Sequence, residues 1–237
     1  MKNRIGIIGA MDSEIAYLTS VLKRKKVKML YGLSFYTGQI GGKDVVIVKS
    51  GIGKVNAARC AQILIDRFSL TAIINTGIAG AIDPSLNVGD IVIATDLVQH
   101  DFDVTGLGYV KGYMFTGSDT KKPTLFHADP DLVARIEKAA GKHADVKRIN
   151  KGIIASGDVF VSSSKVKNDI RKTFSAMAAE MEGASIAQTA AYGNIPFAVV
   201  RVMSDRADGK ASVSMKEFEE ETAKLSASVL ESFIKEF

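Results

Sequence analysis

Short apolar runs with few polar interruptions alternate along this 237-residue chain with segments whose apolar residues recur at helical spacing. The clearest runs cover residues 4–9, 72–76 and 197–203. Strands that are apolar at almost every position are typical of a sheet that helices cover on both faces. The alternation therefore predicts an α/β fold, namely a three-layer α/β/α sandwich around a central sheet.

Two glycines indicate that the predicted sheet is mixed. Gly41 and Gly42 separate predicted strands at residues 33–40 and 44–49, and glycine accepts the positive φ angles of a tight hairpin turn. Residues 77–81 are expected to form a turn. The other predicted elements are strands at residues 90–98, 148–155 and 178–181, and helices at residues 55–68, 130–141, 164–173 and 183–192, with one helix from residue 12 or 13 and a last one from Ser214. No repeat or linker interrupts this order, so we expect a single domain over residues 1–237.

Residues 101–123 are rich in glycine, tyrosine and phenylalanine and have no clear periodicity. An irregular stretch of this length inside a compact domain is usually a functional loop or an interface. We therefore expect this segment to form a pocket lid or a subunit contact.

Charge and cysteine content narrow the classes of function. The chain has 31 basic and 26 acidic residues, and the excess lies in short runs such as residues 23–26 and 121–122, without interleaved aromatics that could stack on bases. We expect solvated surface there and no nucleic-acid partner. The single cysteine, Cys60, indicates a reducing compartment. No apolar run is long enough to span a bilayer and no leader peptide is recognisable, so a cytoplasmic location without membrane attachment is predicted.

Several familiar motifs are incomplete. The segment 51–54 looks like a phosphate-binding loop, but Val48 stands where its first glycine is required and Val55 replaces the hydroxyl residue that would hold magnesium. No two of the three histidines stand at metal-ligand spacing, and no serine lies in a Gly-x-Ser-x-Gly elbow. We therefore predict neither a metal nor a cofactor.

The remaining candidates are carboxylates at strand ends, where α/β folds collect ligand-binding groups. Glu14 follows the first strand, and it is either a site residue or an acid that stabilises a helix N-terminus. Glu180 and Glu182 alternate about Met181, which places both acids on one side of an extended chain or else marks the start of a helix. Asp205 follows a predicted strand, and on its own it could be a loop residue or an N-cap.

Together these segments have the order and spacing of one family. They are Gly6-Ile7-Ile8-Gly9-Ala10-Met11 with Glu14, Lys49-Ser50-Gly51-Ile52-Gly53-Lys54-Val55, Asn75-Thr76-Gly77, Val88-Gly89-Asp90, Ser156-Gly157-Asp158, Glu180-Met181-Glu182 and Ser204-Asp205. The chain resembles the 5′-methylthioadenosine/S-adenosylhomocysteine nucleosidases of the purine nucleoside phosphorylase superfamily, over essentially its whole length. This resemblance implies a nucleoside phosphorylase-like fold and hydrolysis of the N-glycosidic bond of an adenine nucleoside.

The resemblance also implies residue roles. Asp205 would be the general acid that protonates N7 of adenine, and Glu14 would be the base that activates water. A proton transfer of this kind near neutral pH requires a carboxyl whose pKa burial has raised. Glu182 would bind the ribose hydroxyls, Arg201 would organise the water and the carboxylates, and Phe160 would stack on adenine. The implied binding set also includes Met11, Ile52, Ile78, Leu107, Val161, Met181, Ser204 and Met215.

Two departures from the family pattern concern the water and the 5′ pocket. Ile78 stands in the turn Thr76-Gly77-Ile78-Ala79-Gly80-Ala81 where the family usually has serine, which removes a hydroxyl near the expected water. Leu107 and Met215 replace phenylalanines that commonly line the 5′ pocket. A softer apolar pocket could shift the preference among 5′ substituents.

Two other functions stay open at this point. A phosphate-dependent phosphorylase would need an arginine in the loop at residues 9–14, which carries acids instead and would repel phosphate. A non-catalytic purine-binding homologue would keep the fold without turnover. The family resemblance further implies a homodimer in which residues 101–123 complete the partner's 5′ pocket. The sequence does not rank 5′-methylthioadenosine, S-adenosylhomocysteine, 5′-deoxyadenosine and aminofutalosine as substrates.

Overall fold

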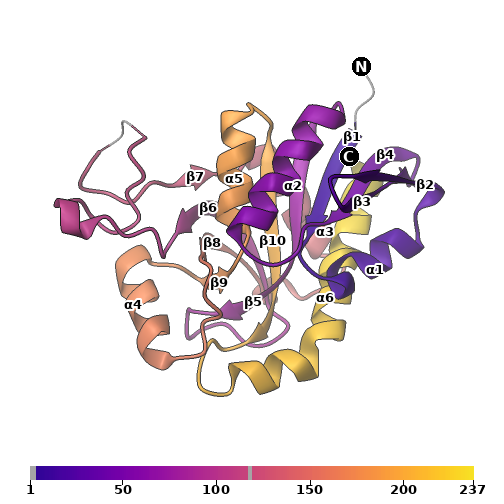
Figure 1. Ribbon diagram of the computed structural model, residues 1–237. Coiled ribbons are helices and arrows are strands. Elements are labelled where there is room, and N and C mark those ends of the chain that lie inside the picture. Colours follow the sequence, from indigo (N-terminus) through magenta and orange to yellow (C-terminus); the bar gives the residue numbers. More distant parts are fainter. Residues whose placement is uncertain (1–3, 117–118) are drawn as a thin grey trace.

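The computed structural model describes residues 4–116 and 119–237 (Figure 1). The strands are β1 (Arg4–Gly9), β2 (Lys23–Leu30), β3 (Leu33–Ile40), β4 (Lys43–Lys49), β5 (Ala72–Ala81), β6 (Ile91–Gln99), β7 (Phe126–His127), β8 (Ile149–Ser156), β9 (Ala178–Glu180) and β10 (Phe197–Asp205). The helices are α1 (Asp12–Ser20), α2 (Lys54–Arg67), α3 (Pro130–Ala140), α4 (Ser164–Phe174), α5 (Gly183–Tyr192) and α6 (Ala211–Glu236), with short 3₁₀ turns η1 (Thr105–Leu107) and η2 (Val146–Arg148).

The strands form one mixed sheet in the order β10-β6-β8-β9-β5-β1-β4-β3-β2, and β7 adds to β6. Strands β1, β4, β5 and β10 run parallel, whereas β6 is antiparallel to β10 and the β2–β3–β4 segment is an antiparallel meander. Strand β10 also pairs with β5, so five strands close into a ring at one end of the sheet. The predicted mixed sheet is therefore confirmed, and its ring is an additional feature.

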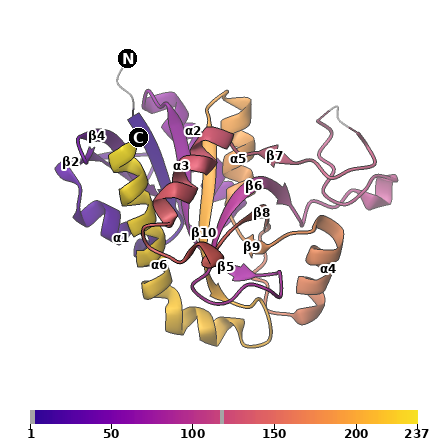
Figure 2. The ribbon, with the colours of Figure 1, turned by 180° about the vertical axis from the view of Figure 1, so that it is seen from behind.

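Helices cover both faces of this sheet, which confirms the predicted three layers. Helices α2 and α5 lie together on the face seen in Figure 1, and α3 and α6 lie on the opposite face seen in Figure 2, with α1 beside α6. Alanines on the buried sides of α2 and α5, such as Ala57, Ala61 and Ala187, allow these two helices to pack closely. The main core lies between the helices and the central strands, whose isoleucines and valines are almost fully buried.

Strand β2 is the main element that the sequence pattern did not reveal. Seven of its eight residues are exposed, so it lacks the apolar signal of a buried strand and reads only as a basic run. The run itself contains no aromatic residue, but two rings lie beside it in the folded chain. Lys25 stands over the Tyr36 ring, and Lys28 stands over the Phe68 ring. The absence of a nucleic-acid partner stays a prediction.

Two element boundaries also differ from those predicted. The prediction of a turn at residues 77–81 is wrong, since β5 continues through these residues and pairs with both β9 and β10. Helix α6 begins at Ala211, so Ser214 lies inside its first turn and does not cap it. Glycines at residues 77 and 80 predict a break, but pairing with β9 and β10 keeps this segment extended. The capping-box spacing of Ser214 predicts a helix start, but the helix begins three residues earlier.

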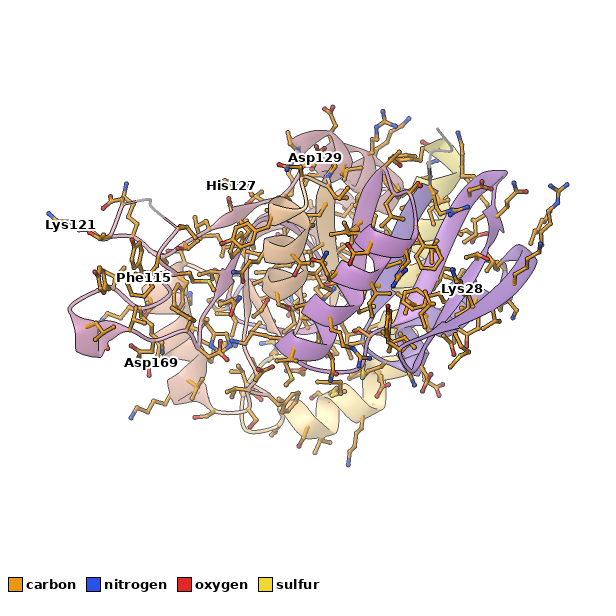
Figure 3. All side chains as sticks on the ribbon, turned by 45° about the horizontal axis from the view of Figure 1, so that its top comes forward. Lys28, Phe115, Lys121, His127, Asp129 and Asp169 are labelled. Carbon is orange, nitrogen blue, oxygen red and sulfur yellow. The ribbon has the colours of Figure 1, made fainter. Side chains whose placement is uncertain are left out.

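The segment at 101–123 projects from the body of the molecule, as the labels Phe115 and Lys121 show in Figure 3. Apart from η1, its described residues are irregular, as expected, and residues 117–118 lie outside the described ranges. The rings of Tyr109, Tyr113 and Phe115 pack against one another at centroid distances of 4.9–5.2 Å. Among the described helices, none is both long and apolar enough to cross a membrane.

Candidate active site

The predicted acids meet at the carboxyl ends of β1, β5, β9 and β10, around an open cavity whose empty space, together with the solvent at its mouth, is about 520 Å³. This cavity is lined by Ala10, Met11, Glu14, Ile52, Ile78, Ala79, Gly80, Phe160, Ala179, Glu180, Met181, Glu182, Ser204, Asp205 and Met215. A smaller hollow adjoins it and adds Val159 and Val161 to the shared lining of Phe160, Met181 and Asp205. The arrangement brings residues from distant parts of the chain to one edge of the sheet, as expected for an α/β fold.

Glu14 is the third residue of α1 and is almost completely buried. Its Oε2 accepts hydrogen bonds from the backbone N–H groups of Ala10 (2.6 Å) and Met11 (3.0 Å), and its Oε1 accepts one from Ile78 (3.0 Å). Burial raises the pKa of the Glu14 carboxyl, against the effects of Arg201 and of these three N–H groups. One oxygen of Glu14 therefore caps the helix, and the carboxylate also lines the cavity.

A glycine makes room for this carboxylate on the adjacent strand. A Cβ atom added to Gly77 in β5 would lie 2.2 Å from Glu14 Oε1, far inside van der Waals contact. The strand and α1 can therefore approach this closely only because residue 77 has no side chain.

Asp205 ends β10 and is 2% exposed. Its Oδ1 accepts a hydrogen bond from the Ala207 N–H (2.7 Å), and its Oδ2 accepts one from the Ser204 hydroxyl (2.9 Å). Burial raises the pKa of the Asp205 carboxyl, although these two hydrogen bonds favour the ionised form. Asp205 is thus a buried carboxyl that retains a proton to higher pH than an ordinary aspartate.

Glu180 and Glu182 line the cavity and form a buried cluster with Arg201, which lies behind them. Arg201 Nη2 donates to Glu180 Oε2 at 2.5 Å and to Asn75 Oδ1 at 2.5 Å, and it lies 3.9 Å from Glu182 Oε2. Glu182 Oε1 accepts a hydrogen bond from the Gly53 N–H at 2.9 Å. Burial, and next the repulsion from Glu180, raise the pKa of Glu182 to about 8.

Glu180 is a site residue to which the sequence analysis assigned no role. Its carboxylate accepts hydrogen bonds from the N–H groups of Glu182 (3.1 Å) and Gly183 (3.0 and 2.8 Å) and from the Ser156 hydroxyl. It therefore caps the start of α5, while both acids reach the same arginine. Strand β9 ends at Glu180 and Glu182 is the N-cap residue of α5, so this acidic pair marks the start of a helix and does not lie on one extended strand. The alternation about Met181 is the signal that could have identified Glu180.

Most of the implied binding set lines the cavity or the hollow: Met11, Ile52, Ile78, Phe160, Val161, Met181, Glu182, Ser204 and Met215. Two predicted members do not. Arg201 is 1% exposed and contacts the cavity only through the acids, and Leu107 lies in η1 with 70% exposure, on the projecting segment. Within the ranges 4–116 and 119–237, no group of three or more histidine, cysteine or acidic side chains could hold a metal ion.

Comparison with known proteins agrees with this geometry. The sequence pattern of the Phosphorylase superfamily matches residues 4–235. A 5′-methylthioadenosine/S-adenosylhomocysteine nucleosidase of Staphylococcus haemolyticus is 43% identical over 98% of this chain and 99% of its own length. The nucleosidase of Neisseria meningitidis, solved with methylthio-immucillin-A, superposes with a TM-score of 0.93 at 38% identity, covering 99% of this chain and 100% of that one.

The Streptococcus pneumoniae nucleosidase, solved with 8-aminoadenine, superposes with a TM-score of 0.90 at 41% identity and covers the full length of both chains. Each comparison extends over nearly all of this chain, including the strands and loops that carry the buried carboxylates. The chain therefore belongs to the phosphorylase superfamily and, within it, to the 5′-methylthioadenosine/S-adenosylhomocysteine nucleosidases.

Proposed function

We propose that this chain hydrolyses the N-glycosidic bond of 5′-methylthioadenosine and S-adenosylhomocysteine, releasing adenine and the 5′-thioribose product. The observation that carries the proposal is the division of the cavity. Asp205 lines both the main cavity and the hollow beside Phe160 and Val161, whereas Glu14 lines the main cavity only. The proposed proton donor for the base thus borders the hollow as well as the main cavity, whereas the proposed acceptor for the water proton borders the main cavity alone.

The chemistry requires both groups. Water attacks C1′ while the C1′–N9 bond breaks, and the bonding electron pair moves to the purine. Asp205 delivers its proton to N7, so that adenine leaves as a neutral molecule, and Glu14 accepts a proton from the attacking water. The raised pKa of Asp205 keeps that proton available, and proton transfer of this kind contributes about 10² to 10⁴ in rate.

The buried acids also favour the positive charge that develops on the ribose. Glu14, Glu180 and Glu182 all interact with Arg201, the single cation of this cluster. Glu180 balances the charge of Arg201, so the ionised Glu14 that accepts the proton of the water leaves a net negative charge, which stabilises a cationic sugar at the transition state. Glu182, whose Oε1 is held by the Gly53 N–H, is the group we assign to the ribose hydroxyls.

Water is favoured over phosphate as the nucleophile. Among the described residues that line the cavity, none is a lysine or an arginine, and Arg201 is engaged with Glu180 and Asn75. A phosphorylase would need free cations to bind its dianionic substrate.

We also propose a cytoplasmic homodimer whose partner subunit completes the 5′ pocket. Ile52 lines the cavity and is 52% exposed, and the projecting segment exposes large apolar side chains at Leu107 and Phe115. Exposed apolar side chains of this kind are typical of protein interfaces. Sedimentation at micromolar concentration should give a dimer, and a monomer alone would contradict the assignment.

Release of free adenine from a panel of 5′-substituted adenosines, with and without phosphate, tests the function. Hydrolysis predicts equal rates in both conditions and a free 5′-thioribose product. A rate that falls to zero without phosphate would identify a phosphorylase. Tight binding of the nucleoside with no adenine released would identify a binding protein.

A further inference from the structure

Three loops of the site meet at one partly buried ion pair outside the cavity. Lys54 Nζ donates to Asp101 Oδ1 at 2.6 Å and to Gln99 Oε1 at 3.0 Å. The side chains of Lys54 and Asp101 are only 18% and 22% exposed. Neither residue lines the cavity, so neither is part of the chemistry described above.

The pair binds the loop that precedes the hollow. The backbone N–H of Lys54 donates to Asp158 Oδ1 at 2.8 Å, and the backbone N–H of Asp158 donates to Asp101 Oδ2 at 2.8 Å. Asp101 thus uses one carboxylate oxygen for Lys54 and the other for Asp158. The result is a closed set of hydrogen bonds among three segments that are more than 40 residues apart in sequence.

These segments carry the residues that form the binding surface. Phe160 and Val161 follow Asp158 by two and three residues and line the hollow. Ile52 and the Gly53 N–H, which binds Glu182, directly precede Lys54. The ion pair therefore lies between the loop that we assign to adenine and the loop that supports the ribose-binding carboxylate.

Charges and close packing hold these segments together. Burial opposes ionisation of Asp101, but the hydrogen bonds from Lys54 and from the Asp158 N–H outweigh it and lower the pKa of Asp101. A Cβ atom added to Gly157 would lie 2.4 Å from His100 Nε2 and 3.0 Å from Asp101 Cγ, so the loop packs against this strand end at backbone distance. Hydrogen bonds with an ionised partner are roughly twice as strong as neutral ones.

We propose that Lys54 and Asp101 form a positioning pair that holds the Asp158–Val161 loop against the Ile52–Gly53 loop, and so sets the width of the adenine subsite. The inference rests on the proposed function, because it concerns how that site binds the base. Asp205 lies at the end of β10 and has no contact with the pair, so the proton-transfer step does not depend on it. Loss of the pair should weaken binding of substrate and transition state equally, which raises KM and leaves kcat unchanged.

The test compares Lys54→Met, Asp101→Asn and the double variant with the full-length wild type. Steady-state adenine release gives kcat and KM, calorimetry gives the Kd of free adenine, and thermal unfolding gives Tm. Lys151→Met is the matched control, because its Nζ forms a 2.7 Å ion pair with Glu137 away from the cavity. Loss of one charged hydrogen bond predicts that KM and the adenine Kd rise about tenfold in each single variant.

The double variant should resemble each single variant, because the two side chains act as one unit. Lys54→Arg should restore most of the binding, and Lys151→Met should bind like the wild type. An adenine Kd within twofold of wild type in Lys54→Met and Asp101→Asn would overturn the positioning role, as would a fall in kcat at unchanged KM. Wild type that binds adenine but releases none from a nucleoside would overturn the proposed function alone, since the Kd ratios would still decide the role of the pair. Wild type that does not bind adenine would overturn both.

Discussion

The substitution Gly77→Ala tests whether the position of the Glu14 carboxylate matters for the reaction. The added methyl group would lie 2.2 Å from Glu14 Oε1, and ordinary contact begins near 3.4 Å, so the carboxylate must retreat by about 1 Å. This movement breaks or stretches the hydrogen bond from the Ile78 N–H at Oε1. A displacement of about 1 Å in a catalytic group costs on the order of 10² in rate. We therefore expect kcat for adenine release to fall about 100-fold.

The same substitution should also destabilise the fold, because the buried carboxylate loses a charged hydrogen bond worth about 1.5–3 kcal/mol. Thermal unfolding and circular dichroism would show a lower Tm with unchanged secondary structure. The control is Gly141→Ala, since Gly141 lies at φ −60° after α3 and an added Cβ would meet nothing closer than 3.6 Å. Wild-type kcat in a folded Gly77→Ala protein would refute the assignment of Glu14 as the base.

Three further substitutions probe the other groups of the site. Asp205→Asn should reduce adenine release by about 10²- to 10⁴-fold in single-turnover assays while calorimetry still detects bound nucleoside, and near-normal turnover would remove the acid assignment. The pKa of Glu182 is about 8 in the folded protein and near 4.5 in the unfolded chain, so its contribution to stability is complete below pH 4.5 and is lost as the pH rises through about 8. The Tm should therefore fall between pH 5 and pH 8. In Glu182→Gln the dependence of Tm on pH should be weaker. An equal change of Tm with pH in the wild type and in Glu182→Gln would contradict the raised pKa of Glu182. Ile78→Ser keeps the N–H that binds Glu14 and adds a hydroxyl to the cavity, so kcat should increase while Tm falls. An unchanged kcat would show that the missing hydroxyl does not limit the attack of water.

The sequence was sufficient to predict the layered fold and the main acids. Glu14 and Asp205 follow strongly apolar runs, and the carboxyl ends of parallel strands meet at one edge of a sheet, so their convergence could be expected. The length of β5 could not be predicted, because Gly77 looks like a turn residue unless one knows that Glu14 packs against it. The ring formed by β10 also depends on pairings with β5 and β6, between segments that are more than 100 residues apart.

Supporting residues were harder to predict than the acids themselves. The partner of Glu180 is Arg201, which lies on a different strand, and no local pattern connects the two. Lys54 stands in an incomplete phosphate loop and in one of the family segments, and neither pattern reveals that its side chain donates to Asp101. Leu107 was assigned to the site through the family resemblance, and its exposed place on the projecting segment leaves that role dependent on a second subunit.

The sheet ends at β2, beside whose outer backbone groups no other strand lies in the described part of the chain. A free edge of eight residues would normally invite another molecule to add a strand and start a filament. Here Lys23, Arg24, Lys25, Lys26 and Lys28 line that edge, so an approaching copy would meet the same five positive charges. Electrostatic repulsion of this type is short-ranged and weakens in concentrated salt. Self-association of the protein through this edge should therefore increase with ionic strength, far from the cavity where the reaction takes place.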